Sequence, residues 1–171
     1  MKNLSVPLLK QGKMECGPTC LAMVLKYFGK NITKEEITRK IGLKKYGVRT
    51  IDLANFARNL GFKVYCYSNN KILFEGKANI KKPSKSDILN FLKIGLPVII
   101  SIRSYVLFNE EKSEEGHFIV IVGYENKKFI YNDPYVGKQK NIGENKLMKA
   151  LKENSLDSSA YLLVLKPQKG K

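Results

Sequence analysis

The sequence predicts an α+β fold, with an N-terminal helical lobe followed by a C-terminal lobe built on a mostly antiparallel sheet. Apolar residues recur at helical spacing in the first part of the chain, whereas β-branched runs and tight turns dominate after residue 97. A length of 171 residues and a hydrophobic content of 43% suit a single domain over residues 1–171. The polar tail, about residues 166–171, is expected to be disordered.

The helices are expected where capping and stop signals flank an apolar face. Residues 1–10 precede them as an extended arm or a short strand. A first helix is expected over about residues 16–28, because its apolar side chains share one face and Gly29 follows it. Further helices are expected over 33–41 behind a Thr33–Glu36 capping box, over 51–60 behind Thr50, over 85–94 behind Ser84 or Ser86, and over 144–153.

Strands are expected where β-branched and aromatic residues run between turn signals. The pattern after residue 97 also predicts a polar loop over residues 104–115 and another loop over 133–137. The expected strands cover residues 62–67, 98–102, 118–124, 128–132 and 161–165, with turns at Asn69–Asn70 and at 125–127.

The formal net charge of +16 indicates attraction to an acidic partner, which could be nucleic acid, an anionic membrane or an acidic peptide. Solvated lysines in a lysine-rich proteome explain the charge equally well. The lysines are scattered and form no nucleic-acid-binding motif, so no nucleic-acid partner is expected.

Three cysteines cannot form a complete set of disulfides, and one histidine with scattered cysteines makes a poor zinc site. A reducing compartment is therefore expected. The N-terminus lacks a signal peptide, and no stretch approaches the roughly 18 apolar residues of a membrane span. These features predict a cytoplasmic protein without a membrane span.

Cys16 lies where a loop becomes the first helix, and Pro18 fits the first helical turn. The positive end of the helix dipole favours a thiolate there, which is the form that a nucleophilic cysteine needs. A cysteine before a helix is usually a small core residue, so this position alone decides nothing. Cys20 and Cys66 are expected to be core residues.

A thiol nucleophile needs a base, and His117 is the only histidine in the chain. His117 begins one expected strand, and Asp133 ends the next. In a hairpin these two positions lie side by side, so Asp133 is placed to orient the imidazole. A lone histidine or an Asp-Pro turn is usually structural, but the ordered combination with Cys16 favours catalysis.

An acyl-transfer site also needs donors for the developing oxyanion. The backbone N–H of Cys16 is one candidate, and the side-chain amide of Gln11 is the other. Gly17 leaves room for a substrate backbone beside the thiol, and Gly116 is expected to contact substrate next to His117. Glu15 is expected to be a surface or loop-capping residue rather than a catalytic acid.

The stretch ECGPTCLAMVLKYFG resembles the cysteine motif of the bacteriocin-processing, double-glycine peptidases, which are papain-like cysteine peptidases often fused to ABC exporters. The resemblance continues in YGVRTIDLANFARNLGFKV, GLPVII, GHFIVIVGY and the DP of YNDPYVG. It implies a papain-like fold with Cys16 as nucleophile, His117 as base, Asp133 as its orienting partner and Gln11 as oxyanion donor. Gln11 lies five positions before the cysteine, where many members have six.

The resemblance implies a stand-alone peptidase that cleaves a leader peptide after a Gly-Gly-type site, with no metal or organic cofactor. No exporter domain follows in the sequence, so a separate ABC exporter is the expected partner. A basic surface would suit an acidic leader helix. Three alternatives remain open: a papain-like amidase or acyl transferase, a non-catalytic peptide-binding domain of the same fold, and a basic nucleic-acid-binding module.

Overall fold

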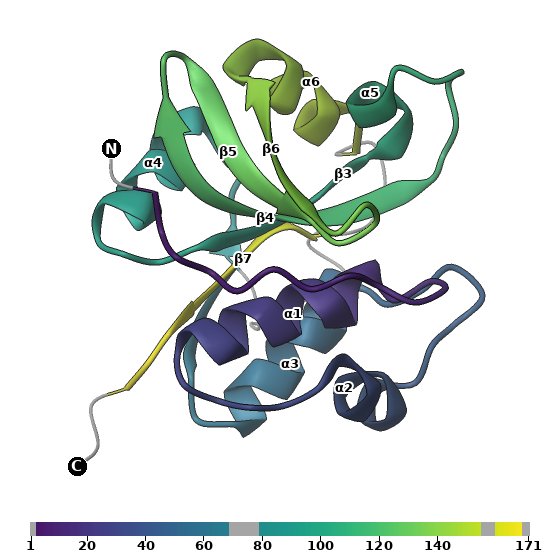
Figure 1. Ribbon diagram of the computed structural model, residues 1–171, viewed down its shortest axis with the longest axis vertical. Helices are drawn as coiled ribbons and strands as arrows, with labels where there is room; N and C mark the ends of the chain where they lie inside the picture. The colour runs from purple at the N-terminus through teal and green to yellow at the C-terminus, as the bar shows by residue number, and fades with distance from the viewer. Residues whose placement is uncertain (1–2, 69–78, 155–159, 169–171) are drawn as a thin grey trace.

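The computed structural model describes residues 3–68, 79–154 and 160–168 (Figure 1). Three helices form the N-terminal lobe: α1 (Cys16–Tyr27), α2 (Lys34–Ile41) and α3 (Thr50–Asn59). The predicted capping box of α2 is present, because Thr33 Oγ1 accepts the Glu36 N–H and Glu36 accepts the Thr33 N–H. Three further helices lie on the sheet: α4 (Lys85–Lys93), α5 (Ser104–Phe108) and α6 (Glu144–Asn154).

Within the described ranges, seven strands form one sheet in the order β2-β1-β7-β3-β4-β5-β6. Every neighbouring pair is antiparallel except β1 and β2. The mostly antiparallel sheet confirms the predicted α+β fold class. The strands are β1 (Lys63–Ser68), β2 (Asn79–Ile80), β3 (Val98–Arg103), β4 (Gly116–Glu125), β5 (Lys128–Asp133), β6 (Lys138–Gly143) and β7 (Ala160–Lys166).

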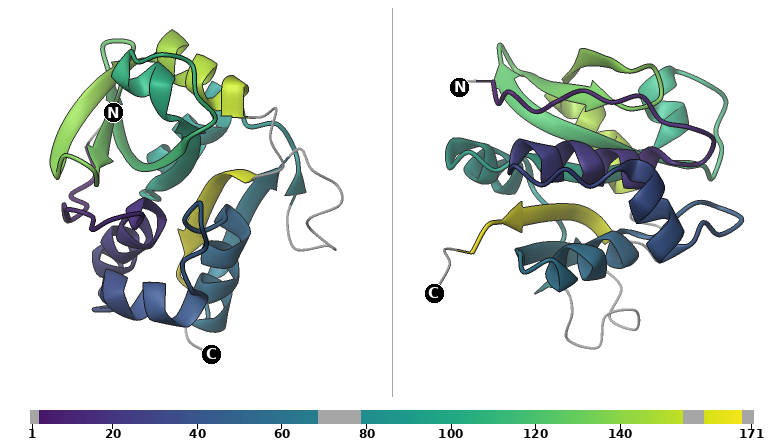
Figure 2. Two further views of the ribbon diagram at one scale, coloured as in Figure 1. Left: turned by 90° about the vertical axis from the view of Figure 1, so that its right-hand side faces the viewer. Right: turned by 60° about the horizontal axis from the view of Figure 1, so that its bottom comes forward.

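The sheet separates two layers of apolar side chains, because successive residues of a strand point to opposite faces. In β4, Phe118 and Val120 belong to the core shared with α1 and α3, whereas Ile119 and Ile121 belong to the core shared with α4, α5 and α6. Figures 1 and 2 show α1–α3 on one side of the molecule and α5 and α6 on the opposite side. Burial on both faces makes β4 a rigid support for the residue at its start.

An extended arm, residues 3–15, runs between α1 and the sheet (Figure 1). The Leu4 N–H donates to Val122 O at 2.8 Å, and the Gln11 N–H donates to Pro134 O at 2.8 Å. The buried Asn132 side chain donates to Val6 O at 3.1 Å. The arm thereby brings the residues just before α1 to the end of β5.

The structure corrects three sequence predictions. Residues 104–108 of the predicted polar loop form α5, and residues 138–143, for which no strand was predicted, form β6. Arg49 rather than Thr50 is the N-cap of α3, because Asp52 accepts hydrogen bonds from the Arg49 backbone and guanidinium. The predicted turn at Asn69–Asn70 lies outside the described residues.

Lys166, the first residue of the predicted tail, belongs to β7, and residues 169–171 are outside the described ranges. Within the ranges that are described, no helix is long and apolar enough to cross a membrane.

Candidate active site

Helix α1 begins at Cys16, with Glu15 at the N-cap position. The residues of α1 that follow Cys16 pack into the core, so the packing of the helix sets the position of the thiol. The Cys16 side chain itself is only partly buried and lines a cleft. The sequence therefore placed this cysteine correctly at the start of a helix.

His117 and Asp133 are in direct contact, although 16 positions separate them in the chain. His117 Nε2 lies 3.0 Å from Asp133 Oδ1. The contact arises because β4 and β5 form an antiparallel hairpin, so the start of one strand lies beside the end of the other. Both side chains are buried, His117 at 6% exposure and Asp133 at 0%.

Cys16 and His117 interact directly, and each shifts the pKa of the other through hydrogen bonding and charge. Burial alone would raise the pKa of the Cys16 thiol, but His117 and the backbone N–H groups of Phe118 and Gly17 outweigh it, so the pKa is lowered. The arrangement favours a thiolate next to an imidazolium.

The pKa of His117 is shifted in the opposite direction, upward. Burial alone would lower the pKa of His117, but hydrogen bonds to Asp133 and Cys16, together with their charges, raise it to about 9. The Tyr135 N–H donates to the same Asp133 Oδ1 at 3.0 Å and holds the carboxylate in place. Asp133 Oδ2 is buried, and none of the described residues forms a hydrogen bond with it.

Two aromatic rings cover His117, and sequence reasoning missed both. The centroids of Phe108 and Tyr135 lie 5.6 Å and 6.4 Å from that of the imidazole, and 5.7 Å from each other. Phe108 ends α5, in the segment that was predicted to be a loop. The apolar run YVLF within that segment was the available signal. The rings limit the access of water to the imidazole.

Gln11 lies on the wall of the same cleft as Cys16. Its Nε2 donates to Gly12 O at 3.2 Å, and its buried Oε1 has no hydrogen-bond partner among the residues that the structure describes. The backbone N–H of Gln11 is bound to Pro134, directly after Asp133. Three of the four predicted catalytic residues, Gln11, Cys16 and His117, thus line one cleft, and the buried Asp133 contacts His117. The oxyanion role of Gln11 stays a prediction.

The two glycines expected to contact substrate differ in their surroundings. Gly17 is buried, and a Cβ atom there would lie 2.5 Å from Val48 Cγ2, so packing explains the glycine. Gly116 lines the cleft, and its nearest neighbour to an added Cβ is Ile102 O at 3.8 Å. Their roles toward substrate stay predictions.

The cleft has a volume of about 1270 Å³ and lies between the arm with the start of α1 and the edge of the sheet lobe. Its walls carry more cations than anions, which favours an anionic ligand. The cationic residues are Lys10, Lys13, Arg49, Arg103, Lys138 and Lys140, and the anionic residues are Glu114 and Glu115. In the part of the chain that the structure describes, no group of three or more His, Cys, Asp or Glu residues is placed to hold a metal ion.

Cys16 is expected to react far faster with iodoacetamide at about pH 6 than the other two cysteines. Burial raises the pKa of Cys20 well above its ordinary value and that of Cys66 to about 12, whereas the pKa of Cys16 is lowered. Limiting reagent followed by peptide mass spectrometry measures the order of labelling. Equal labelling of all three thiols would contradict an activated Cys16.

The family model described as "Peptidase_C39 like family" matches residues 3–158. The chain therefore belongs to the Peptidase_C39-like family, which confirms the resemblance seen in the sequence. The chain is therefore classed with the C39-like peptidases.

Individual relatives agree with this assignment. Over 135 residues the chain is 27% identical to the probable microcin-H47 secretion/processing ATP-binding protein MchF of Escherichia coli, covering 78% of this chain and 15% of MchF. It is also 27% identical to the colicin V secretion/processing ATP-binding protein CvaB of the same organism. The chain thus spans only about 15% of the length of these curated relatives.

Solved structures share the fold. A putative C39-like peptidase from Bacillus anthracis superposes with a TM-score of 0.74 at 16% identity, covering 99% of this chain and 100% of that one. A double glycine motif protease from an AMS/PCAT transporter, solved in complex with the leader peptide, superposes with a TM-score of 0.61 at 25% identity. That match covers 97% of this chain and 94% of the protease.

Proposed function

We propose that this chain is a cysteine peptidase that cuts a leader peptide after a Gly-Gly-type site through Cys16, His117 and Asp133. The observation that carries the proposal is that the imidazole of His117 interacts both with the Cys16 thiol, whose pKa it lowers, and with the buried carboxylate of Asp133. A nucleophile, a base and an orienting group are the three parts that a cysteine peptidase needs for acyl transfer.

The reaction has two halves. The Cys16 thiolate attacks the scissile carbonyl and forms a carbon–sulfur bond. The imidazolium of His117 then protonates the leaving amine as the carbon–nitrogen bond breaks. In the second half, neutral His117 takes a proton from water, the hydroxide attacks the thioester, and the carbon–sulfur bond breaks to release the acid. Asp133 stabilises the imidazolium, and the backbone N–H of Cys16 with the Gln11 amide stabilises the oxyanion.

The substrate class rests on the relatives and on the charge of the cleft. One neighbour is a double glycine motif protease solved in complex with the leader peptide, and the curated relatives are secretion/processing ATP-binding proteins. Four lysines on the cleft wall make no ion pair within the described residues, so an acidic leader would complement them. They are Lys10, Lys13, Lys138 and Lys140. A separate ABC exporter is the proposed partner, and the cytoplasm is the proposed compartment.

The proposal is tested with a peptide that carries an acidic leader, Gly-Gly and a short following segment. The wild-type chain is expected to cut after the second glycine, and Cys16→Ala is expected to lower the rate at least about 10³-fold, because no thioester can form. Mass spectrometry of the products locates the cut. Replacing the leader acids by glutamine should raise KM, and added salt should remove that difference.

Other outcomes separate the alternatives. Turnover of small amides or acyl acceptors without peptide cleavage would favour a papain-like amidase or acyl transferase. Peptide binding without any Cys16-dependent turnover would favour a non-catalytic binding domain. A peptide in which leucines replace both glycines is the matched control, and equal cleavage of that peptide would contradict the Gly-Gly specificity.

A further inference from the structure

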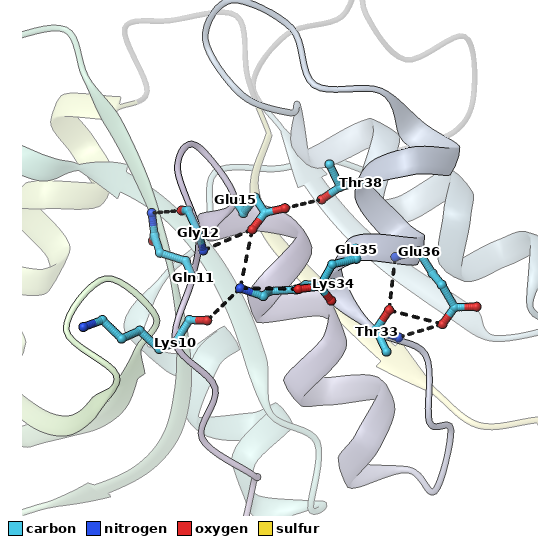
Figure 3. Close-up of polar contacts among 9 residues, drawn as sticks. All are labelled: Lys10, Gln11, Gly12, Glu15, Thr33, Lys34, Glu35, Glu36 and Thr38. Atoms are coloured by element: carbon cyan, nitrogen blue, oxygen red, sulfur yellow. Dashed lines mark hydrogen bonds and ion pairs between the residues drawn. The ribbon is translucent and has the colours of Figure 1, made fainter.

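The carboxylate of Glu15, next to Cys16, is fully engaged by the protein. Its Oε2 accepts the Gly12 N–H at 3.1 Å, and its Oε1 accepts the Thr38 hydroxyl at 3.3 Å (Figure 3). The side chain is 16% exposed and lies 3.5 Å from Lys34 Nζ. Glu15 therefore joins the turn before α1 to helix α2.

Lys34 completes this connection from the α2 side. Its Nζ lies beside the Glu15 carboxylate and donates to Lys10 O at 3.1 Å. One ammonium group thus contacts both ends of the segment 10–15, and Gln11 lies inside that segment (Figure 3).

The turn leaves no freedom around Gly12. A Cβ atom at that position would lie 2.4 Å from Glu15 Oε2, so the carboxylate packs directly on the backbone. Gly12 O in turn accepts the Gln11 Nε2–H at 3.2 Å. A path of contacts therefore runs from Glu15 to the N–H of Gly12, and from the carbonyl oxygen of Gly12 to the Gln11 side-chain amide.

We propose that Glu15, held by Lys34 and Thr38, is a positioning residue that places the Gln11 amide in the cleft. This inference rests on the proposed function, in which Gln11 stabilises the oxyanion. Glu15 does not take part in proton transfer, because Gly12, Thr38 and Lys34 occupy its oxygens. It acts by keeping a donor aimed at a charge that develops only in the transition state.

Glu15→Ala is expected to lower kcat about 10- to 100-fold with little change in KM, the loss caused by misplacing a catalytic group by about 1 Å. Glu15→Gln keeps an acceptor for the Gly12 N–H and should recover most of the rate. Gln11→Ala alone should cost about 10²–10³ in kcat, and adding Glu15→Ala to it should cost less than about 3-fold more. If the two substitutions instead lowered kcat by independent factors that multiply in the double variant, the proposal would be overturned.

Alkylation of Cys16 separates a positioning role from a direct effect on the thiolate. Its rate and pH profile should stay within about 2-fold in Glu15→Ala, because His117 still stabilises the thiolate. A shift of that profile would mean that the charge of Glu15 acts on Cys16 itself, and would overturn the role through Gln11.

The matched control is Glu36→Ala. Glu36 Oε2 accepts the Thr33 N–H, also three residues earlier, at 3.0 Å, but in a solvent-exposed capping box (Figure 3). This variant should lower the melting temperature without changing kcat. A kcat loss equal to that of Glu15→Ala would mean that any weakening of α2 has the same effect, and would overturn the proposal.

A direct measurement does not depend on turnover. The side-chain ¹⁵N–¹H₂ resonances of Gln11, identified by their absence in Gln11→Ala, should be dispersed in the wild type and move to free-glutamine values in Glu15→Ala. Unchanged resonances would overturn the positioning role. Moved resonances in a chain that cuts no peptide would support positioning by Glu15 while contradicting the proposed peptidase function.

Discussion

Replacing His117 by alanine removes the base altogether and is expected to lower kcat/KM by about 10⁴-fold or more. Two effects combine. The variant loses the group that protonates the leaving amine, and Cys16 loses the hydrogen bond and the charge that lower its pKa. Burial, which raises the pKa of the thiol, is then opposed only by the backbone N–H groups of Phe118 and Gly17.

The second effect is visible without a substrate. Labelling of Cys16 by iodoacetamide at about pH 6 should slow at least about 100-fold in His117→Ala, because the thiolate fraction falls. Cys66→Ala is the control, since it also truncates a buried strand residue, 2% exposed, but outside the cleft. That control should lower the melting temperature and leave turnover intact. Rapid labelling of Cys16 in His117→Ala would show that the imidazole does not stabilise the thiolate.

The parts of the site that depend on local sequence patterns could be predicted from the sequence. The placement of Cys16 follows from helix signals alone. The contact of His117 with Asp133 follows from two strands joined by a tight turn, in which Asn126 and Lys127 both have left-handed backbone conformations, with φ of 49° and 59°. A hairpin fixes which residues are neighbours, so a separation of 16 positions was no obstacle.

The missed elements lack such patterns. Strand β6 lies at one edge of the sheet, and Ile142 is its one buried residue, so no alternation of polar and apolar residues marks it. Helix α5 is too short to show helical periodicity, and acidic residues follow it. Both elements matter for the site, because α5 supplies Phe108 and β6 supplies two lysines of the cleft.

Contacts between distant segments could not be predicted either. The final strand β7 lies between β1 and β3, an arrangement that depends on the whole sheet rather than on any local sequence. The contact of Glu15 with Lys34 likewise depends on how α2 packs beside α1. Sequence reasoning therefore identified Glu15 as a loop-capping candidate but could not show which groups its carboxylate binds.

Changing Asp133 to asparagine is expected to lower kcat between about 10²- and 10⁴-fold while the chain stays folded. Asparagine has the same shape, and its oxygen can still accept the Tyr135 N–H that Asp133 accepts at 3.0 Å. The variant loses the negative charge beside the imidazole. The pKa of His117, raised to about 9 by contacts that include Asp133, should therefore fall.

The pH dependence of turnover reports this change with a definite sign. The ion pair needs a protonated His117, so wild-type activity should decline as the pH rises through about 9. In Asp133→Asn the decline should occur at a lower pH, because burial still opposes the charged imidazole. Asn132→Ala is the control: Asn132 contacts Val6 and Gln139, so its loss should lower the melting temperature without moving the alkaline decline.

An unchanged alkaline decline in Asp133→Asn, together with near-wild-type turnover, would show that Asp133 does not orient the base. If His117→Ala were still inactive, Cys16 and His117 would act as a dyad, and the contact at 3.0 Å would serve only to pack the hairpin. Asn132 could not replace Asp133 in that role, because its amide is committed to Val6 O and its oxygen to Gln139 Nε2. The orientation of the imidazole would then depend on the rings of Phe108 and Tyr135 that cover it.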